Sequence, residues 1–246
     1  MDHHVGAAHR SRRRRVTLAA LAAIVVIVLG LGAVVIVLTS HRKVLLIGDS
    51  IMQSAGPAAT GELQRQGFQV QVAAFFGTGL LDTRFDWLTK MRQLVAQYQP
   101  DIVVVEFVGN YGLFGTRPGI AAMTPQFYAA WAAAAQQATD ILSSDHAQVY
   151  WVLGPPMAMP AMEQKVTTLD MIYLSLRAPA SPARRPLFVD EVKPFVDAQG
   201  RYLASIVGPD GKQVPLRMPD GVHLAVPAGT QRFADAITAT LLAKTG

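Results

Sequence analysis

The residues best suited to acid–base chemistry are a histidine and an aspartate near the carboxyl end of the chain. They occur in the segment Asp220-Gly-Val-His223, just before a run that we expect to be helical. Of the six histidines, only His223 lies in a segment that combines a nearby acid with turn residues. A general base needs its imidazole held in one tautomer by a carboxylate, and a short loop can bring side chains at this spacing together. The structural alternative is a histidine that only packs.

Several other kinds of chemistry are excluded or disfavoured by composition. The chain has no cysteine, so it has no disulfide framework, thiol nucleophile or cysteine-bound zinc. Beyond the first fifteen residues no two histidines have metal-ligand spacing, and we expect no metal. Gly77-x-Gly79-x-x-Asp82 contains part of a dinucleotide fingerprint, but its third glycine is missing, and no Walker A pattern occurs. We therefore expect no cofactor.

The elements that must position these residues are short strands that alternate with helices. Apolar runs predict strands over residues 43–47, 68–75, 102–108, 148–153 and 187–189. Continuous apolar runs of this kind are typical of parallel strands buried on both faces. Helical stretches cover about residues 55–66, 84–98, 125–142, 161–176 and 227–244. This alternation predicts an open α/β sheet with helices on both faces.

Turn signals divide the region before the last helix. Residues 197–200 and 208–211 both read as turns, and we expect residues 201–207 between them to form a small hairpin.

Glycine follows each of the first four predicted strands, and two of these strand ends also carry a polar side chain suited to catalysis. The four segments are Gly48-Asp-Ser50, Gly77-Thr-Gly79, Gly109-Asn-Tyr111 and Gly154-Pro-Pro156. Ligands of open α/β sheets bind outside the carboxyl ends of the strands. The sequence therefore predicts a site at this edge of the sheet.

In combination, the motifs resemble the SGNH/GDSL hydrolase superfamily. The resemblance rests on Gly48-Asp-Ser-Ile51, Gly79, Gly109-Asn110 and Asp220-x-x-His223, which occur in this order over nearly all of residues 41–246. It implies a flavodoxin-like three-layer α/β/α sandwich with a central, mainly parallel sheet. Members of the superfamily act as esterases, lipases, carbohydrate deacetylases or O-acyltransferases.

The resemblance also implies a role for each motif residue. Ser50 is expected to be the nucleophile, His223 the base that activates it, and Asp220 the group that orients His223. The oxyanion hole is expected to consist of the backbone amides of Ser50 and Gly79 and the side-chain amide of Asn110. Serine needs such a base, and preorganised donors stabilise the tetrahedral intermediate.

Two features of the chain leave part of this assignment open. Gly77 competes with Gly79 for the second position of the oxyanion hole. Tyr111 stands where the family often has a second aspartate, so the local support of Asn110 differs from the family pattern.

The amino-terminal part of the sequence predicts a membrane anchor. Residues 1–15 hold five arginines against one aspartate, which is most of the chain's net charge of +5. Residues 16–38 contain no charged residue and are long enough to cross a bilayer, which takes roughly 20 apolar residues. The arginines predict a cytoplasmic amino terminus, and the domain over 41–246 is then extracytoplasmic. Because the positive charge lies in the tail, we expect no nucleic-acid partner.

From these observations we expect a single-pass cell-membrane protein whose domain is a serine esterase or O-acyltransferase. The expected substrates are acylated carbohydrates or other esters, most of all O-acyl groups of cell-envelope glycans. A lipid esterase and a non-catalytic glycan-binding or scaffold protein with the same fold are the alternatives. The sequence identifies no protein partner.

Overall fold

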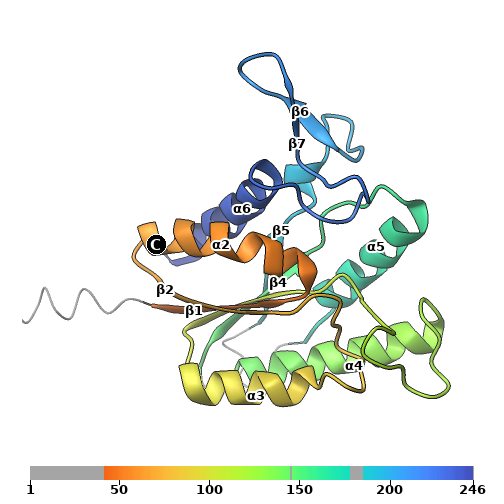
Figure 1. The fold of residues 1–246 in the computed structure, drawn as a ribbon. Helices are drawn as coiled ribbons and strands as arrows, with labels where there is room; N and C mark the ends of the chain where they lie inside the picture. Colours follow the sequence, from red (N-terminus) through yellow and green to blue (C-terminus); the bar gives the residue numbers. More distant parts are fainter. Residues whose placement is uncertain (1–41, 145, 178–184, 246) are drawn as a thin grey trace, which may run out of the picture. The chain divides into compact units, whose positions relative to one another are not determined.

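The computed structural model describes residues 42–144, 146–177 and 185–245. In this part of the chain a parallel sheet lies between two layers of helices (Figure 1). The strands are β1 (Lys43–Gly48), β2 (Gln69–Ala74), β3 (Ile102–Glu106), β4 (Gln148–Leu153) and β5 (Leu187–Asp190), with a hairpin of β6 (Ser205–Val207) and β7 (Gln213–Pro215). The helices are α2 (Ser50–Arg65), α3 (Trp87–Tyr98), α4 (Pro125–Leu142), α5 (Pro160–Leu174) and α6 (Ala228–Thr245), with a short 3₁₀ helix η1 (Lys193–Phe195).

The strand order of the sheet is β2-β1-β3-β4-β5, and every neighbouring pair is parallel. This is the flavodoxin-like order, in which the chain reverses direction along the sheet between β1 and β3. The central strands β1, β3 and β4 are buried along almost their whole length, whereas the edge strands are partly exposed. This burial explains why the central strands appear in the sequence as unbroken apolar runs. The predicted α/β architecture is confirmed.

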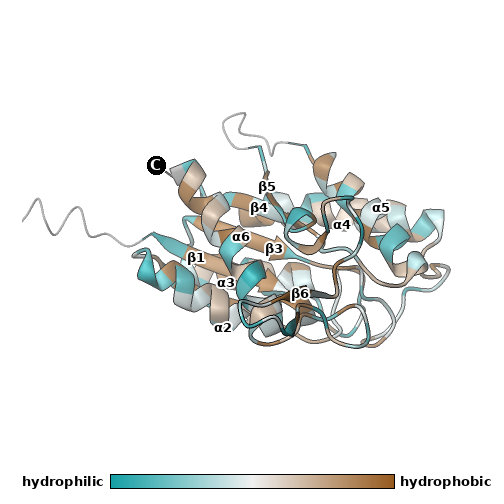
Figure 2. Cartoon of the chain, turned by 90° about the horizontal axis from the view of Figure 1, so that it is seen from above, coloured by the Kyte–Doolittle hydropathy of each residue, from teal (hydrophilic) through white to brown (hydrophobic). Residues whose placement is uncertain are grey.

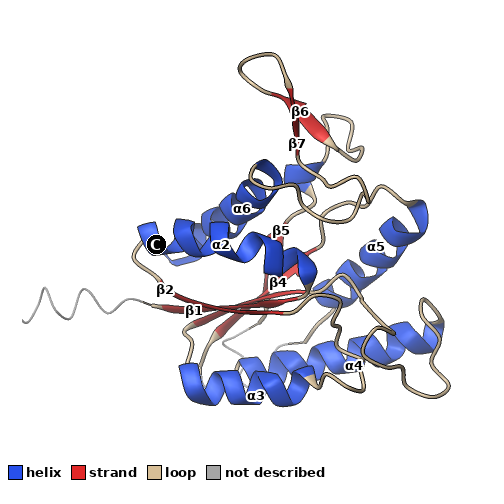
Figure 3. Cartoon of the chain, viewed as in Figure 1, coloured by secondary structure: helices blue, strands red, loops and turns tan. Residues whose placement is uncertain are grey.

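Helices α2 and α6 cover one face of the sheet, and α3 and α4 cover the other (Figures 1 and 3). The apolar colouring in Figure 2 is concentrated on the strands between these layers. One core packs α2 and α6 on the sheet, and the second core contains the three tryptophans Trp87, Trp131 and Trp151. Helix α5 contributes to both cores, through Val166 on one side and Leu169 on the other.

Helix α2 begins at Ser50, five residues before the predicted start. Asp49 caps it, because the Asp49 side chain accepts a hydrogen bond from the amide of Ile51. The serine therefore stands at the first position of a helix that directly follows the central strand β1.

The hairpin is also placed differently from the prediction. The structure pairs β6 with β7, so the turn signal at 208–211 lies between the two strands and not after them. The amide of Gly208 donates to the carbonyl of Lys212 at 2.8 Å, and Gly211 adopts a φ of +77°. This turn closes a hairpin that projects beyond α6 (Figure 1).

The described residues include no helix that is both long and apolar enough to span a membrane. The predicted anchor over residues 16–38 and the basic tail lie outside the described residues.

Candidate active site

Ser50 is placed by the tight connection between β1 and α2. Gly48 ends the strand, and a side chain at this position would collide with Met52 and with Glu106. Ser50 is 8% exposed, so its hydroxyl lies at the surface of a buried turn. Among the hydrogen bonds of the described residues, the Ser50 amide is not a donor to any protein group. This N–H is therefore available at the helix amino terminus, where the backbone dipole favours negative charge.

Asp220 and His223 are brought together by a turn in the loop before α6. One carboxylate oxygen of Asp220 accepts the amides of Val222 and His223, each at 2.9 Å. Gly221 adopts a φ of +69°, a backbone conformation that favours glycine. The amide of Met218 donates to the carbonyl of His223 at 2.8 Å and closes the loop. The spacing of the Asp and His side chains therefore follows from local turn chemistry.

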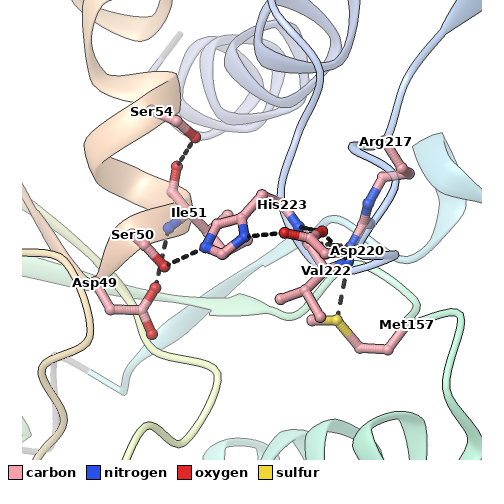
Figure 4. Close-up of polar contacts among 9 residues, drawn as sticks. All are labelled: Asp49, Ser50, Ile51, Ser54, Met157, Arg217, Asp220, Val222 and His223. Atoms are coloured by element: carbon pink, nitrogen blue, oxygen red, sulfur yellow. Dashed lines mark hydrogen bonds and ion pairs between the residues drawn. The ribbon is translucent and has the colours of Figure 1, made fainter. Parts of the chain in front are cut away.

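The three side chains form one continuous chain of hydrogen bonds (Figure 4). The Ser50 Oγ lies 2.9 Å from the Nε2 of His223, and the Nδ1 of His223 lies 2.7 Å from the Oδ2 of Asp220. Partial burial opposes ionisation of Asp220, but the hydrogen bonds from His223 and Val222 outweigh it and lower the pKa of Asp220 to about 2. Asp220 is thus a carboxylate at neutral pH, and the Nδ1–H tautomer of His223 leaves Nε2 free to accept the serine proton.

Asp49, the residue before Ser50, stabilises the turn that carries the serine. It is fully buried and accepts hydrogen bonds from the amides of Ile51 and Val108, each at 3.0 Å, and from the side-chain amide of Asn110 at 2.9 Å. Burial raises the pKa of Asp49, and the two backbone hydrogen bonds oppose this shift. Asp49 therefore ties the serine turn to the end of β3 and to Asn110.

Two ionisable residues under the site are not indicated by the sequence motifs. Glu106, at the end of β3, is buried and accepts the amides of Met52 at 3.1 Å and Asp49 at 3.4 Å. Burial and the charge of Asp49 raise the pKa of Glu106 well above its usual value, which favours its protonated form. Lys165 of α5 is 7% exposed and donates to the carbonyl of Gly109 at 3.2 Å. In the sequence, Glu106 is an acidic residue that directly follows a run of β-branched residues, and this could have indicated a buried acid. Nothing in the sequence distinguishes Lys165 from other polar residues of a helix.

The oxyanion role expected for Gly79 stays a prediction, but its amide has another acceptor in this structure. The Gly79 amide donates to the buried carboxylate of Asp82 at 2.7 Å. A side chain at position 79 would collide with the carbonyl of Asn110, and this close backbone approach explains the glycine. The amide of Gly77, by contrast, is not a donor in any hydrogen bond of the described residues. Gly77 directly follows Phe76, whose ring stacks on that of His223 with a centroid separation of 6.2 Å.

Asn110 lies close to the serine turn, as the sequence predicts. Its side-chain nitrogen donates to Asp49 at 2.9 Å and more weakly to the carbonyl of Thr78 at 3.4 Å. One of its two N–H groups is firmly bound, and the other has only the longer contact.

The structure also describes no group of three or more acidic or histidine side chains that could hold a metal ion.

The chain belongs to the family described as "Protein of unknown function (DUF459)", whose model matches residues 43–240. No curated protein sequence matches the chain.

Three solved structures with the same fold are named in their titles as esterases or lipases. A GDSL-like lipase from Bacteroides thetaiotaomicron is 17% identical, with a TM-score of 0.55 over 82% of this chain and 89% of that one. An acetyl xylan esterase is 16% identical, with a TM-score of 0.54 over 81% and 99% of the two chains. A carbohydrate esterase family 3 protein from Talaromyces cellulolyticus is 15% identical, with a TM-score of 0.54 over 82% and 97%. The resemblance to the SGNH/GDSL superfamily is thereby confirmed at the level of the fold.

Proposed function

We propose that this protein is an SGNH-type serine esterase or O-acyltransferase. The observation that carries the proposal is the unbroken Ser50–His223–Asp220 chain of hydrogen bonds at the carboxyl ends of the strands. These hydrogen bonds join residues from opposite ends of the domain. A non-catalytic scaffold protein would not require the three side chains to be aligned in this way.

In the proposed mechanism the Ser50 oxygen attacks the carbonyl carbon of the ester, and its proton moves to Nε2 of His223. The carbonyl oxygen becomes an oxyanion, and we propose the amides of Ser50 and Gly77 and the side chain of Asn110 as its donors. The imidazolium then protonates the leaving alcohol, which departs as the acyl–Ser50 ester forms. Water or a sugar hydroxyl next loses its proton to His223, attacks the acyl group and releases Ser50.

We propose an acylated carbohydrate of the cell envelope as the substrate, with a lipid ester as the second candidate. Two supports exist: the predicted anchor, which would hold the domain outside the cytoplasm, and the fold neighbours whose titles name acetyl xylan and carbohydrate esterases. The proposed localisation is the cell membrane, with residues 1–15 cytoplasmic. A reporter fused after Gly246 tests it, because activity of a reporter that works only in the cytoplasm contradicts this topology.

A fluorophosphonate probe tests the nucleophile directly. We expect labelling of the wild-type protein and none of Ser50→Ala. Ser54→Ala is a matched control, because Ser54 lies one turn further along α2 and its hydroxyl donates to the carbonyl of Ile51 at 2.9 Å. Ser54→Ala should label like the wild type. Absence of labelling in folded wild-type protein would favour the scaffold alternative, and a panel of acetylated sugars and short-chain esters would then have no turnover.

A further inference from the structure

Arg217 is a buried cation directly beside the catalytic loop. It is 4% exposed, and its Nη2 donates to the carbonyl of Val222 and contacts the sulfur of Met157 at 3.6 Å (Figure 4). Its Nε and Nη1 atoms are buried and have no hydrogen-bond acceptor among the described residues. The guanidinium lies over the rings of Phe195 and Tyr202, at 5.5 and 5.6 Å.

This environment is unfavourable for a charge. Burial lowers the pKa of Arg217, and the more distant charges of Asp220 and Glu163 oppose that shift without forming an ion pair with it. A buried charge with unsatisfied donors lowers stability, and apolar side chains of similar volume often replace such groups with no loss of stability. The fold alone therefore gives little reason for an arginine at this position.

The position of Arg217 relative to the triad gives a better reason. Arg217 begins the loop, and it pairs across the loop with Leu224. Its guanidinium holds the carbonyl oxygen of the peptide group between Val222 and His223. The N–H of that same peptide group donates to the carboxylate of Asp220 at 2.9 Å. One peptide unit is thus fixed at both ends, by a cation at its oxygen and by the triad aspartate at its nitrogen.

A cation on a peptide oxygen polarises the group and strengthens the hydrogen bond that its N–H donates. The same charge favours the ionised form of Asp220. Both effects keep Asp220 in the position and charge state that orient the His223 ring.

We propose that Arg217 is a positioning residue for the acid–base pair: it fixes the Val222–His223 peptide group and so keeps Asp220 and His223 aligned with Ser50. The inference rests on the proposed function, because it requires Asp220 and His223 to act as that pair. The charged and titratable groups that face the loop in this argument are Arg217, Asp220, Glu163 and Tyr202.

The test compares Arg217→Met, Arg217→Lys and the control Arg201→Met. Arg201 is an exposed arginine paired with Asp197, so its replacement removes the same charge at an exposed position. For Arg217→Met we expect an unchanged or higher Tm, a kcat lower by about tenfold, and a KM within about twofold. Arg217→Lys should recover part of the lost kcat, and Arg201→Met should resemble the wild type.

A second measurement separates this inference from the proposed function. Nitrogen chemical shifts of the His223 ring report its tautomer without any turnover, and we expect a dominant Nδ1–H form in the wild type and a mixture in Arg217→Met. Full activity of Arg217→Met would overturn the inference, and so would a drop in Tm that accounts for the lost activity. If wild-type Ser50 does not react with the fluorophosphonate probe, the proposed function fails. The tautomer change then still decides the role of Arg217.

Discussion

The two halves of the candidate catalytic site are held in different ways. Ser50 follows a strand that is buried on both faces, and Asp49 beneath it is fully buried and bound by three donors. Asp220 and His223 lie on a loop, with 48% and 31% of their side chains exposed. The proposed nucleophile therefore depends on the core of the sheet, whereas the proposed acid–base pair depends on a local turn and, as we propose, on one buried arginine.

The same contrast appears in the ionisation of the acids. Burial raises the pKa of Asp49 and Glu106, while hydrogen bonds from its own loop lower the pKa of Asp220. The buried side of the site thus favours a proton on Glu106, and the exposed side keeps a full carboxylate beside the histidine. Exposed loops of this kind also open with less free energy than buried strands do. We expect changes to the loop to affect catalysis more than stability, and changes under the serine to affect both.

The largest effect should come from the two groups that exchange the proton. Ser50→Ala and His223→Ala should each lower kcat by about 10⁴-fold or more. The double variant should be hardly worse than either single one, because neither residue works without the other. Steady-state kinetics on a short-chain ester measure this. Additive losses would show that the two residues do not act as a unit.

Asp220→Asn should have a smaller effect than loss of Ser50. An amide in this place no longer favours the required tautomer, and a loss on the order of 10²–10⁴ in kcat is expected. Because the pKa of Asp220 is about 2, the carboxylate is present at every pH from 5 to 9, and the loss should be similar across this range. A strong pH dependence of the loss would contradict the assigned charge state.

Asn110→Ala tests the proposed oxyanion donor, which also donates a hydrogen bond to Asp49. We expect kcat to fall by about 10²–10³ with little change in KM, because an oxyanion donor binds charge that exists only near the transition state. The variant also removes a donor to Asp49, so its urea midpoint has to be measured alongside. A higher KM with an unchanged kcat would make Asn110 a substrate-binding residue instead.

Glu106→Gln should have the smallest effect on activity, within about threefold at neutral pH, because burial favours the neutral form of Glu106, which glutamine resembles. The folded-state pKa of Glu106 lies above its unfolded value, so its contribution to stability is complete at low pH and is lost as pH rises through the folded-state pKa. Glutamine cannot ionise, and the variant should lose less stability than the wild type as pH rises through the folded-state pKa of Glu106. Urea midpoints over a series of pH values measure the difference, with the exposed Asp210→Asn as control. Parallel curves for wild type and Glu106→Gln would show that Glu106 is ionised throughout.

Much of this architecture was predictable from local patterns. The buried central strands are continuous apolar runs, and the strand and helix at 148–153 and 125–142 have the predicted bounds. The pairing of Asp220 with His223 was predictable for the same reason, since a turn of four residues brings the two side chains together. The start of α2 was not predicted correctly. The capping role of Asp49 depends on a hydrogen bond that its side chain accepts from the Ile51 amide, and only the structure shows this bond.

Only the tertiary structure determined the contacts between segments that are distant in the sequence. Backbone direction determined that the amide of Gly79 binds Asp82, and no sequence pattern reports where an N–H points. Glu106 and Arg217 became visible as parts of the site because burial removes water from charged groups and forces each to find a partner or change its ionisation. The sequence by itself determined the alternation of strands and helices and the residue types for catalysis, since both follow from local periodicity and composition. The meeting of Ser50 with His223 required the parallel sheet to place both at the same edge.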